Sequence, residues 1–319
     1  MKLLKQRSTI CFLILPHVHL MDLAGPVQVF YEANNLVPGT YNIQYCGVSD
    51  QQESEQGLML ANLQSVNDVT LQPSDFIFVP GIDFKTFADG GLSSTIAKIS
   101  EWLTLNFRKR VNIASICSGS LVLAEVGLLN ERKCTSHWKC IDYFRRCYPR
   151  VNVVSDCLYA TDDNIFTSAG MTSGIDMALS IVEQHHGPML AAKVAREMVV
   201  YLRRHESNTQ ETIYLDYRTH FSPGVHKVQD HILSHPSQNF TLDELASVAN
   251  MSTRTLTRLF KKSTGHTINE FKTAVRLEMA RTLQGNTDYT AEKIAGLCGF
   301  ENARQLRRLQ NRRPVGSHK

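Results

Sequence analysis

Residues 111–127 read VNIASICSGSLVLAEVG, and this stretch decides the fold class of the first half of the chain. The run 111–117 is largely apolar and ends at Cys117, and a helical pattern follows it. Small residues, Ser115 and Gly119, lie two positions to either side of the cysteine. A buried strand that turns sharply into a helix is the repeating unit of a parallel sheet covered by helices. The stretch therefore predicts an α/β domain with Cys117 at the turn.

Short apolar runs alternate with longer helical patterns on both sides of this unit. The expected strands cover residues 9–15, 41–48, 75–80, 111–117 and 165–168. The expected helices cover residues 22–35, 93–108, 118–127 and 172–186. Strands that alternate with helices of this length predict a doubly wound parallel sheet. We therefore expect one α/β domain over residues 8–204.

The alternation stops after residue 204, and a polar stretch ends in Ser-Pro-Gly at 222–224. Such a stretch predicts a linker over residues 205–224. The segment beyond it has helical patterns only, at 225–234, 242–249, 253–262, 268–283, 291–297 and 302–311. Part of it repeats, because TLDELA at 241–246 matches TAEKIA at 290–295. Residues 225–319 are therefore expected to form an all-α domain with two copies of one unit.

Length and charge also divide the chain. Its 319 residues suggest two domains at ordinary sizes of about 100–200 residues each. The net charge is +4, but residues 226–319 hold 15 Lys or Arg and 8 Asp or Glu, a net of +7. Residues 1–225 have a net charge of −3. The positive excess predicts that the last third, and not the first part, meets a polyanion.

The eight cysteines are scattered, which predicts reduced thiols in a cytosolic protein rather than a disulfide scaffold. The apolar run at 10–15 is short for a signal peptide, and no small-residue cleavage site follows it. No run approaches the roughly 18 apolar residues of a transmembrane helix. We therefore expect a soluble cytoplasmic protein with no membrane partner.

The basic segment contains the pattern of a helix-turn-helix. Thr241 and Glu244 predict a capping box at the start of one helix, and Ser252 predicts the cap of a second. One side of the second helix carries Arg254, Thr257, Arg258 and Lys261. Such a helix enters the DNA major groove, where arginine forms paired hydrogen bonds to guanine. A solvated basic bundle is the alternative, but two copies with Arg on the same helix face favour DNA binding.

Residues 226–313 resemble the AraC/XylS family of bacterial transcription regulators. The resemblance rests on MSTRTLTRLF at 251–260, Gly265, RLEMAR at 276–281 and IAGLCGF at 294–300. It implies DNA contacts by Arg254, Thr257 and Arg258 in the first unit and by Ala303, Arg304, Arg307 and Arg308 in the second. The end of the chain departs from the family, because Gln310 replaces a usual aromatic residue and residues 313–317 replace a usual Phe-Gly and Ser-Pro ending. We therefore expect a second unit that is shortened or less stable.

Residues 9–204 resemble the DJ-1/PfpI superfamily, a glutamine-amidotransferase-like group with a flavodoxin-like fold. The matching motifs are DLAGP at 22–26, FVPG at 78–81, the Cys117 turn with LAEVGLL at 123–129, TSHW at 135–138 and TSAGMTSGID at 167–176. This set is found in regulators that fuse such a domain to an AraC-type domain, and in isonitrile hydratases. The resemblance implies that Asp22 approaches the Cys117 thiol. It also implies a ligand pocket formed by Asp22, Gly81, Cys117, Ser118 and His137.

The turn at Cys117 is compatible with several functions. A helix N-terminus can stabilise a thiolate, so Cys117 with Asp22 is a candidate nucleophile for an isonitrile hydratase or glyoxalase-like enzyme. It is equally a candidate thiol for a redox sensor. Peptidase-type relatives place His directly after the cysteine, and Ser118 in that position argues against proteolysis. Cys134, His137 and Cys140 lack the paired ligands of a zinc site, so no metal is expected.

These patterns together predict a sequence-specific DNA-binding transcription regulator. The first domain is expected to sense a small metabolite or to mediate dimerisation, without catalysis and without a cofactor. The expected partners are double-stranded operator DNA, a small-molecule effector, a second copy of the chain and RNA polymerase.

Overall fold

The computed structural model describes residues 7–155, 157–200, 220, 222–284 and 289–310. The chain divides into two compact units, Met1–Gln210 and Glu211–Lys319. Most of the predicted linker, residues 205–224, lies outside the described residues. Its last two residues, Pro223 and Gly224, begin a helix instead of belonging to the predicted linker, since proline is well suited to the first helical position. No described helix combines the length and the hydropathy of a transmembrane segment.

The first unit is built on a seven-stranded sheet with the order β10-β11-β7-β6-β1-β2-β5. The five predicted strands are β1 (Ser8–Leu13), β2 (Tyr41–Gly47), β6 (Phe76–Val79), β7 (Asn112–Ile116) and β11 (Ile165–Ser168), which pair in parallel. Two edge strands complete the sheet: β5 (Gln64–Ser65), which is parallel, and β10 (Tyr159–Asp162), which is antiparallel. Two small sheets lie apart from it: β3 (Gln51–Glu53) with β4 (Met59–Ala61), and β8 (Lys133–Cys134) with β9 (Asn152–Val153). The predicted α/β fold is confirmed.

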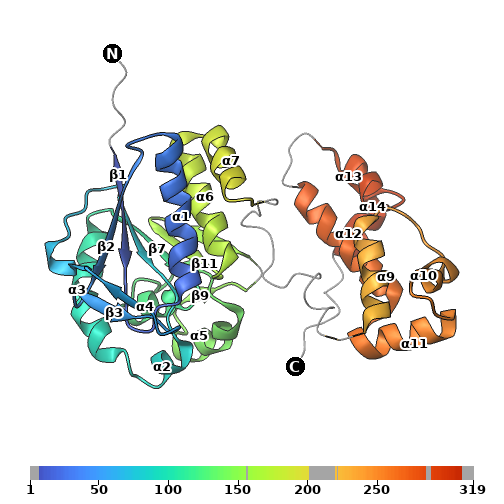
Figure 1. The fold of residues 1–319 in the computed structure, drawn as a ribbon, viewed down its shortest axis with the longest axis horizontal. Helices are drawn as coiled ribbons and strands as arrows, with labels where there is room; N and C mark the ends of the chain where they lie inside the picture. Colours follow the sequence, from blue (N-terminus) through green and yellow to red (C-terminus); the bar gives the residue numbers. More distant parts are fainter. Residues whose placement is uncertain (1–6, 156, 201–219, 221, 285–288, 311–319) are drawn as a thin grey trace, which may run out of the picture. The chain divides into compact units, whose positions relative to one another are not determined.

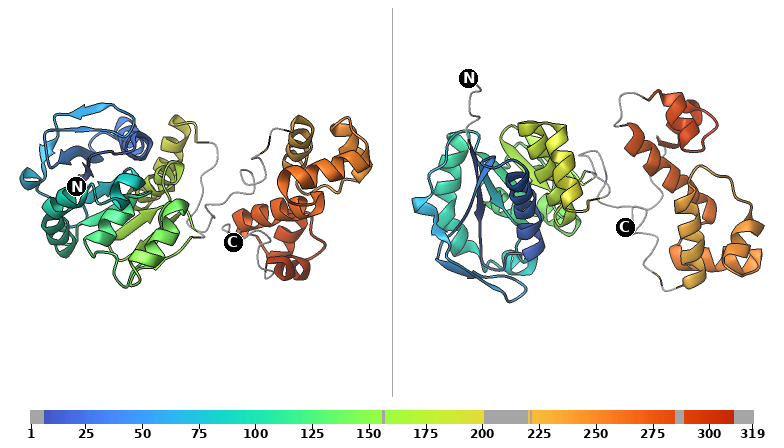
Figure 2. Two further views of the ribbon diagram at one scale, coloured as in Figure 1. Left: turned by 90° about the horizontal axis from the view of Figure 1, so that it is seen from below. Right: turned by 45° about the horizontal axis from the view of Figure 1, so that its top comes forward.

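Helices cover both faces of this sheet (Figures 1 and 2). One face carries α1 (Leu20–Leu36), α6 (Thr172–His186) and α7 (Pro188–Glu197), and the other carries α3 (Ser93–Arg108), α4 (Gly119–Glu125) and α5 (Ile141–Cys147). The unit also contains α2 (Phe84–Ala88) and the 3-10 helices η1 (Val66–Asp68) and η2 (Trp138–Cys140). Because strand side chains alternate, β1 contributes Ile10 and Phe12 to the core under α1, and Cys11 and Leu13 to the core under α3. The sheet is thus buried on both sides, as a parallel sheet requires.

In the second unit, all the regular elements that the structure describes are helices. They are α9 (Pro223–Ser234), α10 (Leu242–Val248), α11 (Thr253–Thr264), α12 (Ile268–Gln284), α13 (Ala291–Leu297) and α14 (Ala303–Gln310). Two separate cores hold them together: α9, α10, α11 and the first half of α12 enclose one, and the second half of α12 encloses the other with α13 and α14. α12 passes from one core to the other between Val275 and Leu277 (Figure 2). The predicted pair of helix-turn-helix units is present.

Candidate functional site

Cys117 lies in the sharp turn between β7 and α4, as the opening motif predicts. Its φ is 56°, which is uncommon for a residue other than glycine and marks a turn held by its surroundings. The Cys117 amide donates a hydrogen bond to Ser168 O at 2.9 Å, and its carbonyl oxygen accepts one from Ser136 Oγ at 3.1 Å. The turn is therefore fixed to β11 and to the TSHW segment.

Glycines allow the surrounding backbone to close around this turn. A Cβ atom at Gly119 would lie 2.2 Å from Val79 O, and one at Gly170 would lie 2.4 Å from Cys117 Cβ. Both separations are far inside van der Waals contact, and neither involves the end of a flexible side chain. Any side chain at either position would force the strand ends apart. The small-residue pattern of the sequence thus has a steric cause.

Asp22 is fully buried in the first turn of α1, beside the cysteine. Its Oδ1 accepts a hydrogen bond from the Met171 amide at 2.6 Å, and its Oδ2 lies 3.5 Å from His19 Nδ1. A Cβ atom at Gly81 would lie 2.2 Å from Asp22 Oδ2, so glycine is required there for the carboxylate to fit. We refer to Cys117, Asp22 and His19 as the Cys117 site.

The electrostatics of the Cys117 site differ from the sequence prediction. Burial raises the pKa of the Cys117 thiol well above its ordinary value, and the negative charge of Asp22 raises it further. The backbone amide of Ser118 at the helix N-terminus lowers the pKa of the thiol, as expected for such a position, but desolvation and the neighbouring carboxylate outweigh this contribution. His19 lies close to the Asp22 carboxylate, and this interaction raises the pKa of His19. The site thus places a buried thiol, whose pKa is raised, beside a close pair of histidine and aspartate side chains.

The other predicted ligand residues have varied roles. Ser118 Oγ donates to Ile82 O at 2.6 Å and accepts from the Ile82 amide at 2.9 Å, so this hydroxyl ties the turn to the segment after β6 and is engaged within the fold. His137 is half-buried, and burial lowers its pKa while the charge of Asp22 opposes the shift. His19 is absent from the sequence prediction.

A metal ion would have to use a different set of residues from the one considered in the sequence. Among the described residues, the potential ligand atoms of His19, Asp22 and Cys117 lie within 4.8 Å of one another, and no other group of three or more is gathered in this way. Cys134 and Cys140 are not part of it. One nitrogen, one oxygen and one sulfur atom are ligand types that Zn²⁺ takes in proteins.

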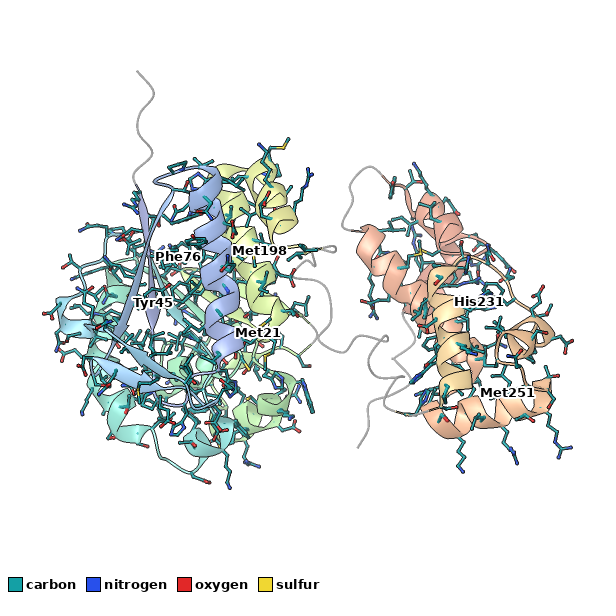
Figure 3. All side chains as sticks on the ribbon, viewed as in Figure 1. Met21, Tyr45, Phe76, Met198, His231 and Met251 are labelled. Carbon is teal, nitrogen blue, oxygen red and sulfur yellow. The ribbon has the colours of Figure 1, made fainter. Side chains whose placement is uncertain are left out.

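The second candidate surface is the outer face of α11. The predicted capping box is present, since Thr241 accepts from the Glu244 amide and Glu244 accepts from the Thr241 amide. Ser252 caps α11 in the same way, by accepting from the Thr255 amide. The exposed face of α11 forms a shallow hollow lined by Thr253, Arg254, Thr257, Arg258, Lys261 and Lys262. Nitrogen-tipped side chains project from α11, away from the rest of its unit (Figure 3).

The second helix-turn-helix unit, α13 and α14, repeats this arrangement, but one of its predicted DNA-contacting residues is buried. Arg304, Arg307 and Arg308 are exposed on α14. Ala303, predicted to contact DNA, is only 5% exposed, and its amide donates to Glu292 Oε2 at 3.0 Å. Its methyl group lies inside the unit because the start of α14 packs on α13. The residues of the unusual chain end, 313–317, lie outside the described residues.

A family model for the DJ-1/PfpI family matches residues 8–184. The chain belongs to the DJ-1/PfpI family. A second model, for a helix-turn-helix domain, matches residues 245–313. This member of the DJ-1/PfpI family therefore carries a helix-turn-helix domain after its α/β unit. Both resemblances stated from the sequence are confirmed.

Relatives of known function extend over both units. The HTH-type transcriptional regulator CdhR of Pseudomonas aeruginosa is 32% identical over 91% of this chain and 84% of CdhR. The regulator GbdR of the same species is 29% identical over 92% of this chain and 78% of GbdR. An isonitrile hydratase of Pseudomonas putida is 30% identical, but over 54% of this chain and 70% of the hydratase. This DJ-1/PfpI family member is a transcriptional regulator.

Solved structures agree on the fold. The crystal structure of an AraC family transcriptional regulator from Pseudomonas putida has a TM-score of 0.52 and 18% identity, covering 60% of this chain and 99% of that chain. At this identity the likeness concerns the fold alone, and it supports the α/β arrangement of the DJ-1/PfpI unit.

Proposed function

We propose that the chain binds operator DNA through α11 and α14, and that a small molecule at the Cys117 site changes this binding. The observation that carries the proposal is the exposed cationic face of α11, with Arg254 and Arg258 one helical turn apart. Arginine side chains with this spacing fit paired contacts to guanine edges and clamps on phosphates. Lys261 extends the same face toward the phosphate backbone.

The exposed arginines of α14 supply a second set of contacts. Two helix-turn-helix units in one chain can occupy successive major-groove faces about 34 Å apart. A second copy of the chain, joined through the α/β unit, would double the number of half-sites, and RNA polymerase would be the partner at the promoter. This role places the protein in the cytoplasm with the DNA.

The Cys117 site has the properties of an effector site. Asp22 Oδ2 and His19 Nδ1 are buried and lie 3.5 Å apart, and neither makes a hydrogen bond to another described residue, so a polar ligand atom can join this pair. The His19 side chain is 21% exposed, which gives a small polar molecule a route to Asp22. A ligand that favours one of two arrangements of the chain shifts the population toward it and changes DNA affinity.

A metabolite screen by thermal shift tests the effector role. A ligand of this site is expected to raise the midpoint of unfolding of the wild-type chain and to change its DNA affinity. Asp22→Asn is expected to abolish both effects, because the amide cannot replace the carboxylate of the ion pair. Asp142→Asn is the matched control, since the Asp142 side chain is 94% exposed. Ligands that act equally on all three chains would contradict the assignment of the site.

Enzymatic hydration of an isonitrile is the second candidate function. The thiol beside a carboxylate favours it, and so does the hydratase relative. The raised pKa of Cys117 opposes it, because the thiolate is the nucleophilic form. We expect a simple isonitrile to be hydrated no faster with the protein than in buffer without it. Turnover above that rate that disappears in Cys117→Ala would establish the hydratase instead.

A further inference from the structure

Arg276 of α12 has the most extensive set of side-chain contacts in the second unit among the described residues, and the predicted DNA contacts do not use it. The residue is only 7% exposed. Nε donates to Pro236 O at 2.8 Å, and Nη1 donates to Gly299 O at 2.8 Å. Nη2 lies within 3.1 Å of Ser237 O, Gln238 O and Asn239 Oδ1. Every described acceptor is an uncharged carbonyl oxygen.

These acceptors belong to different helix-turn-helix units. Residues 236–239 connect α9 to α10 and belong to the unit of α11, whereas Gly299 lies in the turn between α13 and α14. Arg276 itself lies where α12 passes from one core to the other, between Val275 and Leu277. One planar guanidinium therefore binds the backbone of both units at their junction.

Gly299 brings the two helix-turn-helix units of the helical domain into direct contact at the same point. Its φ is +75°, and a Cβ atom there would lie 2.5 Å from Ser237 O and 2.8 Å from Arg276 Cζ. The turn between α13 and α14 thus packs against the loop between α9 and α10, and no side chain fits between them at residue 299. Burial lowers the pKa of Arg276 because it removes water from the charged guanidinium. The hydrogen bonds to the carbonyl oxygens offset this cost of desolvation.

We propose that Arg276 is a positioning residue that fixes the separation and the rotation of α11 relative to α14, so that the chain prefers operators with one spacing between half-sites. The proposal rests on the DNA-binding function proposed above. Lysine cannot reproduce the role, because a single ammonium group cannot donate to both units in a planar fork. A linked pair of DNA-binding units gains affinity only when its geometry lets both bind at once.

The test uses the full chain and duplexes that the wild-type protein selects from random sequence. Each selected duplex is also prepared with one half-site, and with one to three base pairs inserted between the half-sites. Arg276→Lys is expected to bind the intact operator about 10-fold or more weakly, and the single half-site within about twofold of wild type. The affinity of Arg276→Lys is expected to change less than that of the wild type when base pairs are inserted between the half-sites. Gly299→Ala is expected to act in the same way while leaving the Arg276 side chain in place.

Arg281→Gln is the matched control, because Arg281 lies on the same helix and pairs only with the nearby Glu278 among the described contacts. Wild-type affinity and spacing preference in both Arg276→Lys and Gly299→Ala would overturn the inference. An equal loss on the half-site and on the intact operator would also overturn it, since that result indicates a general loss of folding. Failure of the wild-type chain to select any duplex would instead reject the DNA-binding function itself.

Discussion

Arg258→Ala is expected to lower the affinity of the chain for its operator by about 1–3 kcal/mol, roughly 5- to 150-fold. Arg258 is exposed at the centre of the cationic face of α11, between Arg254 and Lys261. Its planar fork can bind both O6 and N7 of a guanine, and alanine leaves these acceptors without a partner inside the interface. Fluorescence anisotropy titrations of a labelled operator measure the loss.

The control for this change is Arg145→Ala, which removes the same charge from an exposed position of the α/β unit. It is expected to leave the affinity within about twofold, because Arg145 lies outside the helices proposed to contact DNA and an exposed charge in salt solution is screened. An equal loss in both variants would mean that net charge, and not the face of α11, determines DNA affinity.

Gly119→Ala is expected to destabilise the α/β unit by about 3 kcal/mol or more. Its added methyl group would lie 2.2 Å from Val79 O and 2.8 Å from Pro80 O, which are backbone atoms of the central sheet and of the segment that follows it. The strand ends must move apart, and the Cys117 turn moves with them. Both tryptophans, Trp102 and Trp138, lie in this unit, so urea unfolding followed by tryptophan fluorescence reports on it selectively.

Gly39→Ala separates this steric effect from backbone strain. Gly39 has a φ of +80° but no atom within 4 Å of an added Cβ. The change is expected to cost only about 1–2 kcal/mol, the usual penalty for a side chain in the left-handed region. A loss in Gly119→Ala no larger than that in Gly39→Ala would contradict the close packing described around Cys117.

The central elements of the fold could be predicted from the sequence because their patterns are local. A buried parallel strand such as 111–117 is a largely apolar run, and α11 has cationic and apolar residues on opposite sides. Elements such as α2 and β5 were not predictable in this way, since their few residues form regular structure only against a neighbouring segment. Residue 303 was assigned to DNA from its place in a motif, and its burial against α13 depends on tertiary packing.

The Cys117 site was only partly predictable for the same reason. The motifs placed Asp22 and Cys117 at the ends of elements that meet at one edge of the sheet. His19 lies three residues before Asp22, a spacing that brings side chains together on a helix, but nothing in the sequence connects it to Cys117. The pKa of the thiol depends on burial and on the Asp22 charge, so the turn motif alone did not predict the direction of its shift. Arg276 belonged to a recognised motif, yet its acceptors lie on two segments that are far apart in the sequence, residues 236–239 and Gly299.

Salt-dependent binding of the wild-type chain to a selected operator tests the central claim most directly. α11 and α14 together expose seven cationic side chains: Arg254, Arg258, Lys261, Lys262, Arg304, Arg307 and Arg308. If most of them neutralise phosphates, the logarithm of the binding constant falls with the logarithm of salt concentration with a slope of about −4 to −6. Both helices would then protect adjacent turns of the duplex from cleavage. Selection of no duplex, or binding whose strength does not change with salt, would contradict the account.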